Sequence, residues 1–166
     1  MIILVADAAP LIFLAKLSLL KSLAERLTVI IPAEVAQEAT ERQDLPDAAS
    51  IRNLIDSRRL TVKPTSGSAV RIFQKKWGLG RGESAALVLS EKVSATLLTD
   101  DYAAMRIAKV LGVAFVTTPF LIVQMQREGL LDRALARAKL ERLEELAWLS
   151  ADVLDAAQKL LEKGEL

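Results

Sequence analysis

Short apolar runs alternate with helical patterns along most of this chain, and the alternation restricts the folds that it can adopt. Ile2 to Ala6 is a continuous apolar run, as a parallel strand covered on both faces would show. Further extended runs are expected at 28–31, 60–63, 95–98 and 113–116. The segments between strands are long enough for right-handed crossovers. The pattern predicts an α/β sandwich with a mostly parallel sheet of four to five strands flanked by helices.

Helices are expected between these runs. Pro10 suits the first helical turn, because its missing N–H costs nothing there, and helical segments follow to about Arg26. Pro32 starts the next helix, and further helices are predicted at 47–58, from Glu83 onward and at 101–111. The segments 65–68 and 78–82 are expected to be connections. From Pro119 onward the whole pattern is helical.

Five acidic residues are candidates for a common site: Asp7, Glu38, Glu83, Asp100 and Asp101. The first follows the first strand and the last two follow the strand at 95–98. Glu38 and Glu83 lie on helices soon after a strand or loop. Ligands of open α/β sheets bind outside the carboxyl ends of the strands, so one edge of the sheet can hold all five.

The absence of histidine and cysteine removes several mechanisms. Catalytic triads with histidine, cysteine–histidine pairs, thiolate or imidazole zinc sites and C-x-x-C redox pairs are excluded. Carboxylate chemistry with a hard metal, or lysine and serine chemistry, remains, and carboxylates are the better placed.

Carboxylates that lie close together need a positive charge or protons to offset their repulsion. Two of them about 4 Å apart repel by about 4 kcal/mol at an effective dielectric near 20. Such a cluster destabilises the fold or takes up protons unless a divalent cation lies within it. Mg²⁺ and Mn²⁺ prefer oxygen ligands, and one or two such ions can activate water for attack on phosphorus.

Four short motifs occur in an order that resembles the PIN-domain ribonucleases, a family that includes toxins of toxin–antitoxin pairs. The first is V-A-D-A-A-P-L-I-F-L-A-K at 5–16, and the second runs from Pro32 through Val35 to Glu38. The third is G-R-G-E-S at 80–84. The fourth is L-T-D-D at 98–101 with Arg106 after it. The resemblance covers roughly residues 1 to 130.

The resemblance implies a PIN-like three-layer sandwich and a nuclease site. It implies Asp7, Glu83 and Asp101 as the metal-binding core for Mg²⁺ or Mn²⁺, with Asp100 and Glu38 close by as ligands or water-orienting groups. Which of Asp100 and Asp101 points inward stays open, since adjacent residues at a strand end face different ways.

Each acid also has a structural explanation. Asp101 and Glu83 favour the positive N-terminal ends of their helices. Glu38 belongs to an acidic helix face and is the weakest candidate. Asp7 has no such explanation if Pro10 is the first helical residue, because the cap then falls on Ala9.

Basic residues near the expected rim are candidates for binding RNA: Lys16, Arg81 and Arg106, together with Arg71, Lys75 and Lys76. Trp77 and Tyr102 offer stacking surfaces, since single strands are held by backbone charge and base stacking. Ordinary surface charge and a core role for Trp77 are equally good explanations.

The expected organisation is a catalytic domain at 1–130 and a helical extension at 131–166, packed on the same domain or at an interface. Its amphipathic stripe contains Leu140, Leu143 and Leu146. By resemblance, an antitoxin and a homodimer are expected partners. The start of the chain lacks the basic region of a signal peptide, so a cytosolic protein without membrane attachment is expected. The net charge of +1 gives no bulk attraction to nucleic acid.

The leading hypothesis is a metal-dependent endoribonuclease acting on single-stranded or structured RNA, the toxin half of a toxin–antitoxin pair. The first alternative is a PIN-like module that binds RNA or protein but cuts weakly or not at all. It is favoured by Ala9, where the family often has a hydroxyl. A second alternative is a phosphatase or phosphotransferase with Asp7 as nucleophile, although the D-x-D pair of such enzymes is absent.

Overall fold

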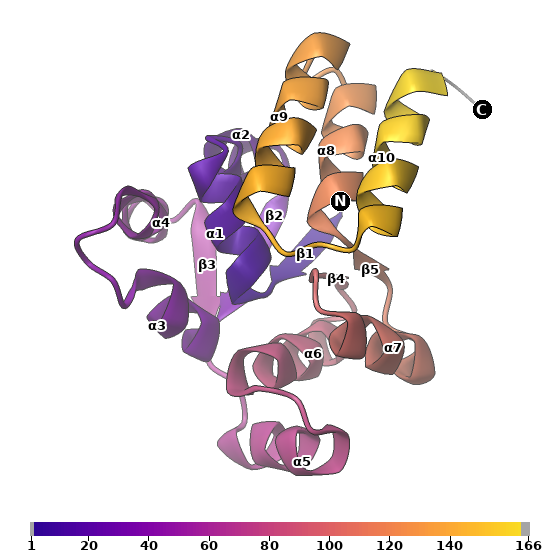
Figure 1. Cartoon of the computed structure of the whole chain (residues 1–166). Coiled ribbons are helices and arrows are strands. Elements are labelled where there is room, and N and C mark those ends of the chain that lie inside the picture. Colours follow the sequence, from indigo (N-terminus) through magenta and orange to yellow (C-terminus); the bar gives the residue numbers. More distant parts are fainter. Residues whose placement is uncertain (1, 164–166) are drawn as a thin grey trace. The chain divides into compact units, whose positions relative to one another are not determined.

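Within residues 2–163, which the structure describes, five parallel strands form one sheet (Figure 1). The structure is a computed structural model. The strand order is β3-β2-β1-β4-β5. The strands are β1 (Ile3–Ala6), β2 (Thr28–Pro32), β3 (Leu60–Lys63), β4 (Thr96–Leu98) and β5 (Phe115–Val116). The predicted α/β class is therefore confirmed, with all neighbouring strands parallel.

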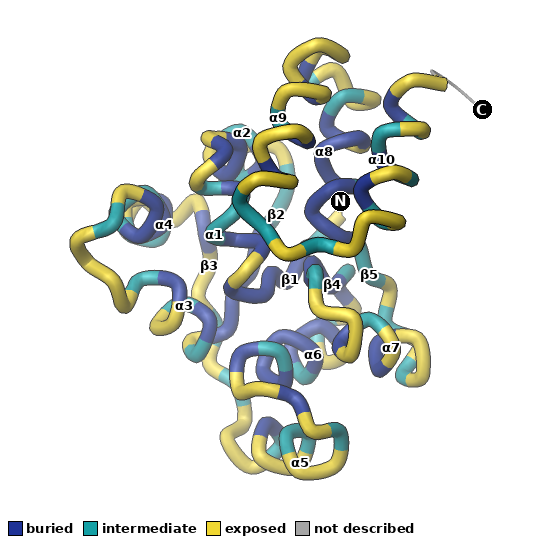
Figure 2. The backbone as a smooth tube through the Cα atoms, in the orientation of Figure 1, coloured by how far each residue is buried: buried dark blue, intermediate teal, exposed yellow. Residues whose placement is uncertain are grey.

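Helices connect consecutive strands. The connections up to β5 contain α1 (Ala8–Lys16), α2 (Leu20–Arg26), α3 (Ala33–Thr40), α4 (Pro46–Asp56), α5 (Gly67–Trp77), α6 (Arg81–Val93) and α7 (Tyr102–Leu111). After β5 come α8 (Thr118–Arg127), α9 (Arg133–Leu146) and α10 (Ala151–Lys163). In Figure 2, β1 is dark blue while the connection from α3 to α4 is yellow, so the central strand of the sheet is buried and this connection faces solvent.

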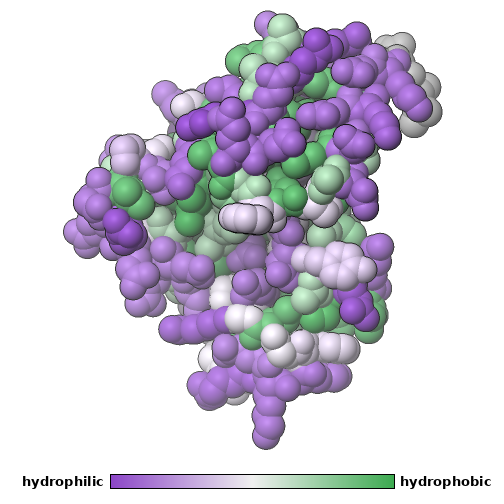
Figure 3. Space-filling view, in the orientation of Figure 1, coloured by the Kyte–Doolittle hydropathy of each residue, from purple (hydrophilic) through white to green (hydrophobic). Residues whose placement is uncertain are grey.

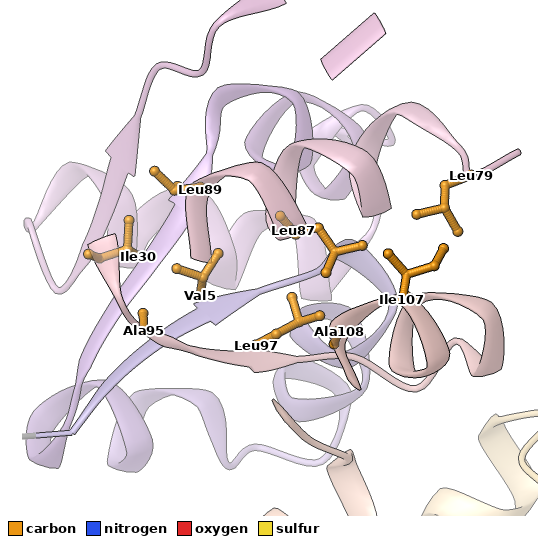
Figure 4. Close-up of a cluster of buried hydrophobic side chains, with 11 residues drawn as sticks. Val5, Ile30, Leu79, Leu87, Leu89, Ala95, Leu97, Ile107 and Ala108 are labelled. Carbon is orange, nitrogen blue, oxygen red and sulfur yellow. The ribbon is translucent and has the colours of Figure 1, made fainter. Parts of the chain in front are cut away.

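One buried cluster joins the sheet to α6 and α7. Val5, Ile30 and Leu97 come from three adjacent strands, and Figure 4 shows them on the side of the sheet that faces Leu87 of α6 and Ile107 of α7. Successive strand residues point to opposite faces, so the neighbours of these residues pack on the other side of the sheet. The continuous apolar runs are explained by this burial on both faces.

The strand order reverses between β1 and β4, where the chain crosses from one half of the sheet to the other. Ala6 pairs with Leu98 in the register of these strands. The backbone N–H of Asp7 then donates to the carbonyl of Leu98 over 2.9 Å. The two strands therefore end side by side, and the residues that follow them begin at the same edge.

Helix α5 occupies a segment for which the sequence pattern predicted no element. Ser66 caps its start by accepting from the N–H of Ala69, and Gly78 ends it in the left-handed region at φ 67°. Such a C-terminal glycine satisfies the last carbonyls of a helix. These two signals flank 67–77 closely enough to define the helix.

The chain divides into two compact units, residues 1–116 with the sheet and residues 117–166 with α8, α9 and α10. The three helices of the second unit pack on one another, and Leu140 and Leu143 of the predicted stripe are fully buried. The predicted boundary at residue 130 stays a prediction. None of the helices between residues 2 and 163 combines the length and apolarity needed to cross a bilayer.

Candidate active site

Asp7 is the most buried acid at the edge where β1 and β4 end. It is 5% exposed, and its Oδ1 accepts from the N–H of Ala8 over 2.8 Å. Asp7 is the N-cap of α1, so the prediction that the cap falls on Ala9 is wrong. Proline is tolerated throughout the first turn, where N–H groups have no helical acceptor, and the helix therefore begins two residues before Pro10.

The carboxylate of Glu38 approaches that of Asp7 beside Gly82. Glu38 lies on the exposed face of α3, and a Cβ placed on Gly82 would be 2.8 Å from its Oε2. The same Cβ would be 3.5 Å from Oδ1 of Asp7 and 3.7 Å from a methyl carbon of Val35. The start of α6 thus fits closely against α3 because residue 82 has no side chain, and two carboxylates meet around this point.

The carboxylate of Glu83 lies against the backbone at Gly80. Gly80 is the N-cap of α6, which begins at Arg81 rather than at Glu83 as predicted. A Cβ on Gly80 would collide with the Glu83 carboxylate. Both glycines of the G-x-G-E motif therefore leave room for the present positions of the acidic side chains, which a Cβ at either residue would displace. Glu83 also lies in the first turn of α6, where the helix dipole favours a negative charge.

Thr99 connects Asp7 with the acidic pair after β4. It is fully buried, and its hydroxyl donates to Oδ2 of Asp7 over 3.4 Å while accepting from the N–H of Asp101 over 3.2 Å. Asp101 is exposed and caps α7, with its Oδ1 accepting from the N–H of Ala104 over 2.7 Å. Asp100 is half-buried between β4 and this cap.

Burial and neighbouring negative charges raise the pKa values of Asp7 and Glu38. The pKa of Asp7 is raised to about 7, chiefly by burial and further by the charges of Glu83 and Glu38, while the hydrogen bonds from Ala8 and Thr99 oppose the shift. The pKa of Glu38 is also raised, first by partial desolvation and then by the charges of Glu83 and Glu41. Asp7, Glu38 and Glu83 therefore share one electrostatic environment.

The acids are close without forming a closed cage. Within the described residues, no three acidic side chains converge on a point where they could hold a metal ion. Repulsion between like charges favours this separation, and the caps of α1 and α7 each engage one oxygen. The donors are all carboxylate oxygens, and a buried acid faces two others, which is chemistry that suits Mg²⁺ or Mn²⁺.

The three predicted basic residues lie at different places. Arg81 is exposed at the start of α6, two residues before Glu83, and Arg106 is exposed on α7. Lys16 ends α1, and a nine-residue helix rising 1.5 Å per residue puts it about 13 Å along the axis from the start. Arg81 therefore begins the helix that carries Glu83, and Lys16 lies a helix length away from Asp7.

Replacing Gly82 by alanine is expected to weaken Mn²⁺ binding by about 10- to 100-fold, as loss of supporting groups around a metal typically does. The added Cβ would displace the carboxylate of Glu38. Folding should change little, since that carboxylate can rotate and alanine is the better helix former. Calorimetric titration measures the affinity. Gly67→Ala is the matched control, because its Cβ would meet only Arg71 at 3.4 Å; equal affinities for both variants would contradict the prediction.

Thr99 is a site residue that the sequence analysis did not single out, although a hydroxyl directly between a buried strand and an acidic pair was a signal. Thr99→Val is expected to lower Mn²⁺ affinity about tenfold, because it keeps the shape and removes the bonds to Asp7 and Asp101. Thr99→Ser should retain the affinity. Unchanged binding by the valine variant would show that the hydroxyl has no such role.

The fold and the acids define an α/β domain with a carboxylate site at the strand ends, and comparison identifies its family. A model of the PIN-domain family matches residues 3–163, so the chain belongs to the PIN-domain family. The fold is similar to PAE2754 from Pyrobaculum aerophilum, with a TM-score of 0.55 and 18% identity over 76% of this chain and 98% of that one. This likeness supports the PIN-like architecture.

Two other solved structures are similar at lower scores. One is a PilT N-terminus domain protein, SSO1118, from the hyperthermophilic archaeon Sulfolobus solfataricus P2, with a TM-score of 0.49 and 16% identity over 84% of this chain and 95% of that one. The other is VapBC2 from Rickettsia felis bound to a DNA fragment from their promoter. Its TM-score is 0.48, with 15% identity over 70% of this chain and 98% of that one. No curated protein matches the chain.

Proposed function

We propose that this protein is an endoribonuclease that hydrolyses RNA phosphodiester bonds with Mg²⁺ or Mn²⁺. The observation that supports this function is the environment of Asp7, a buried carboxylate facing Glu38 and Glu83. Burial and the neighbouring negative charges disfavour the ionised form of Asp7, and a bound divalent cation would offset this cost. PIN domains are typically nucleases and commonly depend on metal.

Asp7, Glu83 and Asp101 would hold the ion, with Glu38 and Asp100 beside them. When bound, it would polarise the scissile phosphate and lower the pKa of the attacking water. The Thr99 hydroxyl orients the Asp7 carboxylate. Arg81 at the start of α6 supplies a positive charge for the RNA backbone.

The test is cleavage of a mixed single-stranded RNA pool with Mg²⁺ or Mn²⁺, using EDTA as the control. Cleavage that EDTA abolishes is the expected result. A DNA pool of the same sequences shows whether cleavage requires the ribose sugar. Absence of RNA cleavage in either metal, from folded protein purified without a bound partner, would overturn the proposed function.

An alternative is a PIN-like module that binds RNA or a protein but cuts weakly or not at all. The observation that favours it is that no three acids converge among residues 2–163. RNA binding that is indifferent to divalent metal, without cleavage, is the result that distinguishes this alternative from a nuclease.

We also propose that the protein acts as the toxin of a toxin–antitoxin pair, on the resemblance of its four motifs to that branch of the family. Induced expression should then stop bacterial growth, and Asp7→Asn should relieve the arrest at equal protein levels. Normal growth with abundant, folded and nucleolytically active protein would contradict the toxin role. The antitoxin and the homodimer stay predictions.

A further inference from the structure

We propose that the groove between the end of α5 and α7 binds one nucleobase of a single-stranded RNA substrate. The groove has a volume of about 220 Å³ and is lined by Trp77 together with Ala103, Arg106, Ile107 and Val110 of α7. It contributes no residue to the acidic site described above. The inference rests on the proposed ribonuclease function, and it names how the substrate is positioned.

The shape and lining of the groove fit a flat, apolar group beside a negative charge. Pockets for drug-sized ligands have about 300–1,000 Å³, so this groove accepts one base rather than a larger ligand. Trp77, which is partly buried against the core cluster, brings an indole ring to the lining, and Ala103, Ile107 and Val110 bring aliphatic side chains. Val110 is 70% exposed, and Figure 3 shows hydrophobic atoms at the surface beside α7. Exposed apolar atoms of this kind gain by being covered.

Positive charge lies at the groove where a phosphate next to a bound base would need it. The Arg106 guanidinium belongs to the lining, and Nζ of Lys76 lies 4.9 Å from the centroid of the Trp77 ring. Aromatic stacking combined with cationic side chains is how proteins hold single strands. An apolar peptide side chain would use the indole but would give Arg106 no negative charge to pair with, so a base that carries its own phosphate is the better occupant.

The walls of the groove are continuous with the elements that carry the acids. Ala103 follows the Asp101 cap by two residues, and Trp77 is joined through 78–80 to the helix of Glu83. Leu79 of this connection and Ile107 of α7 lie side by side in the buried cluster (Figure 4). The groove and the acids are therefore fixed to the same framework, so a base held in the groove places the adjoining backbone in a defined position.

The experiment measures binding without cleavage, in protein that carries Asp7→Asn and Trp148→Phe. Trp77 is then the remaining tryptophan of the sequence, and its fluorescence reports on the groove. The probes are an RNA hexamer and a series in which one position at a time is abasic. We expect the hexamer to quench Trp77. One abasic position should weaken binding at least about fivefold, the low end of the loss of one base–aromatic stack, and the others should not.

A filling substitution supplies the second measurement. Ala103 is exposed in the lining, and Ala103→Met should reduce affinity for the complete hexamer at least about fivefold and remove the effect of the sensitive abasic position. Ala138→Met, at an exposed alanine of α9, is the matched control. Absence of quenching, equal binding of every abasic probe, or Ala103→Met behaving like Ala138→Met would overturn the proposal.

Failure of the groove and failure of the enzyme give different results. A chain that cuts RNA but binds all abasic probes equally is a ribonuclease without this base site. A chain that does not cut RNA but loses affinity at one abasic position retains the base site without the proposed activity.

Discussion

Asp7→Asn is expected to lower RNA cleavage by about a thousandfold or more while leaving the fold intact. The substitution removes the buried charge that would hold the cation, and a metal ion supplies several kcal/mol of transition-state stabilisation at about 1.4 kcal/mol per factor of ten in rate. Asparagine keeps an oxygen that can accept from the N–H of Ala8 and cap α1. Cleavage rates under single-turnover conditions, with circular dichroism as the check of folding, measure the effect.

Asp47→Asn is the matched control, because Asp47 is also buried, at 9% exposure, but lies in the first turn of α4. Its substitution should leave cleavage within about twofold of the wild-type rate, and its removal from a first turn should cost at most about 1 kcal/mol of stability. Cleavage retained by the Asp7 variant, or lost equally in both variants, would remove Asp7 from the proposed mechanism.

In EDTA, Asp7→Asn is expected to be more stable than the wild-type protein at pH 8 and nearly equal to it at pH 4. The pKa of Asp7 is about 7 in the folded chain against 3.8 as its ordinary value, because burial, Glu83 and Glu38 oppose the charge. A proton on Asp7 therefore favours the folded state. This contribution is fully present below pH 3.8 and is lost as the pH rises through 7. At 1.36 kcal/mol per pKa unit, the loss amounts to about 4 kcal/mol.

Urea unfolding of both proteins between pH 4 and 8 measures this difference in the free energy of unfolding. The difference should grow between pH 4 and 7 and then level off. Mn²⁺ at pH 8 should offset part of this loss in the wild-type protein, by about 2.7 kcal/mol at a hundred times its dissociation constant, and should not stabilise the variant. A difference that does not vary with pH would contradict the raised pKa of Asp7.

The sequence was sufficient to predict the inner strands because β1, β2 and β4 are almost wholly buried, which makes them largely apolar. The run at 28–31 differs from β2 by one residue. The run at 60–63 was predicted with the bounds that β3 has, although two of its four residues are exposed. Helix α5 was not predicted, although Ser66 and Gly78 cap it and its core-facing residues Val70, Phe73 and Trp77 recur at helical spacing.

The meeting of Asp7, Glu38 and Glu83 was predictable from the rule that parallel strands present their carboxyl ends at one edge. The close packing around these carboxylates was not predictable, because it depends on the absence of side chains at Gly80 and Gly82. The role of Asp7 as a helix cap depended on where α1 begins, which a proline in the first turn leaves ambiguous by two residues. Lys16 was placed near the rim because a linear motif does not display the length of the helix that separates its two ends.

The crossing of the chain between β3 and β4 has a consequence for protein synthesis. β1 borders β2 on one side and β4 on the other, so its second edge stays unpaired until residues 96–98 have left the ribosome. Thr99, whose hydroxyl donates to Asp7, follows β4 directly and reaches Asp7 only with that pairing. Since chains grow from the N-terminus, an interrupted product that ends just before β4 carries Asp7, Glu38 and Glu83 but lacks Thr99 and Asp101. Under the proposed ribonuclease function, such a product would lack the hydroxyl that orients the Asp7 carboxylate, so cleavage of RNA would require a chain that extends through β4 to Thr99.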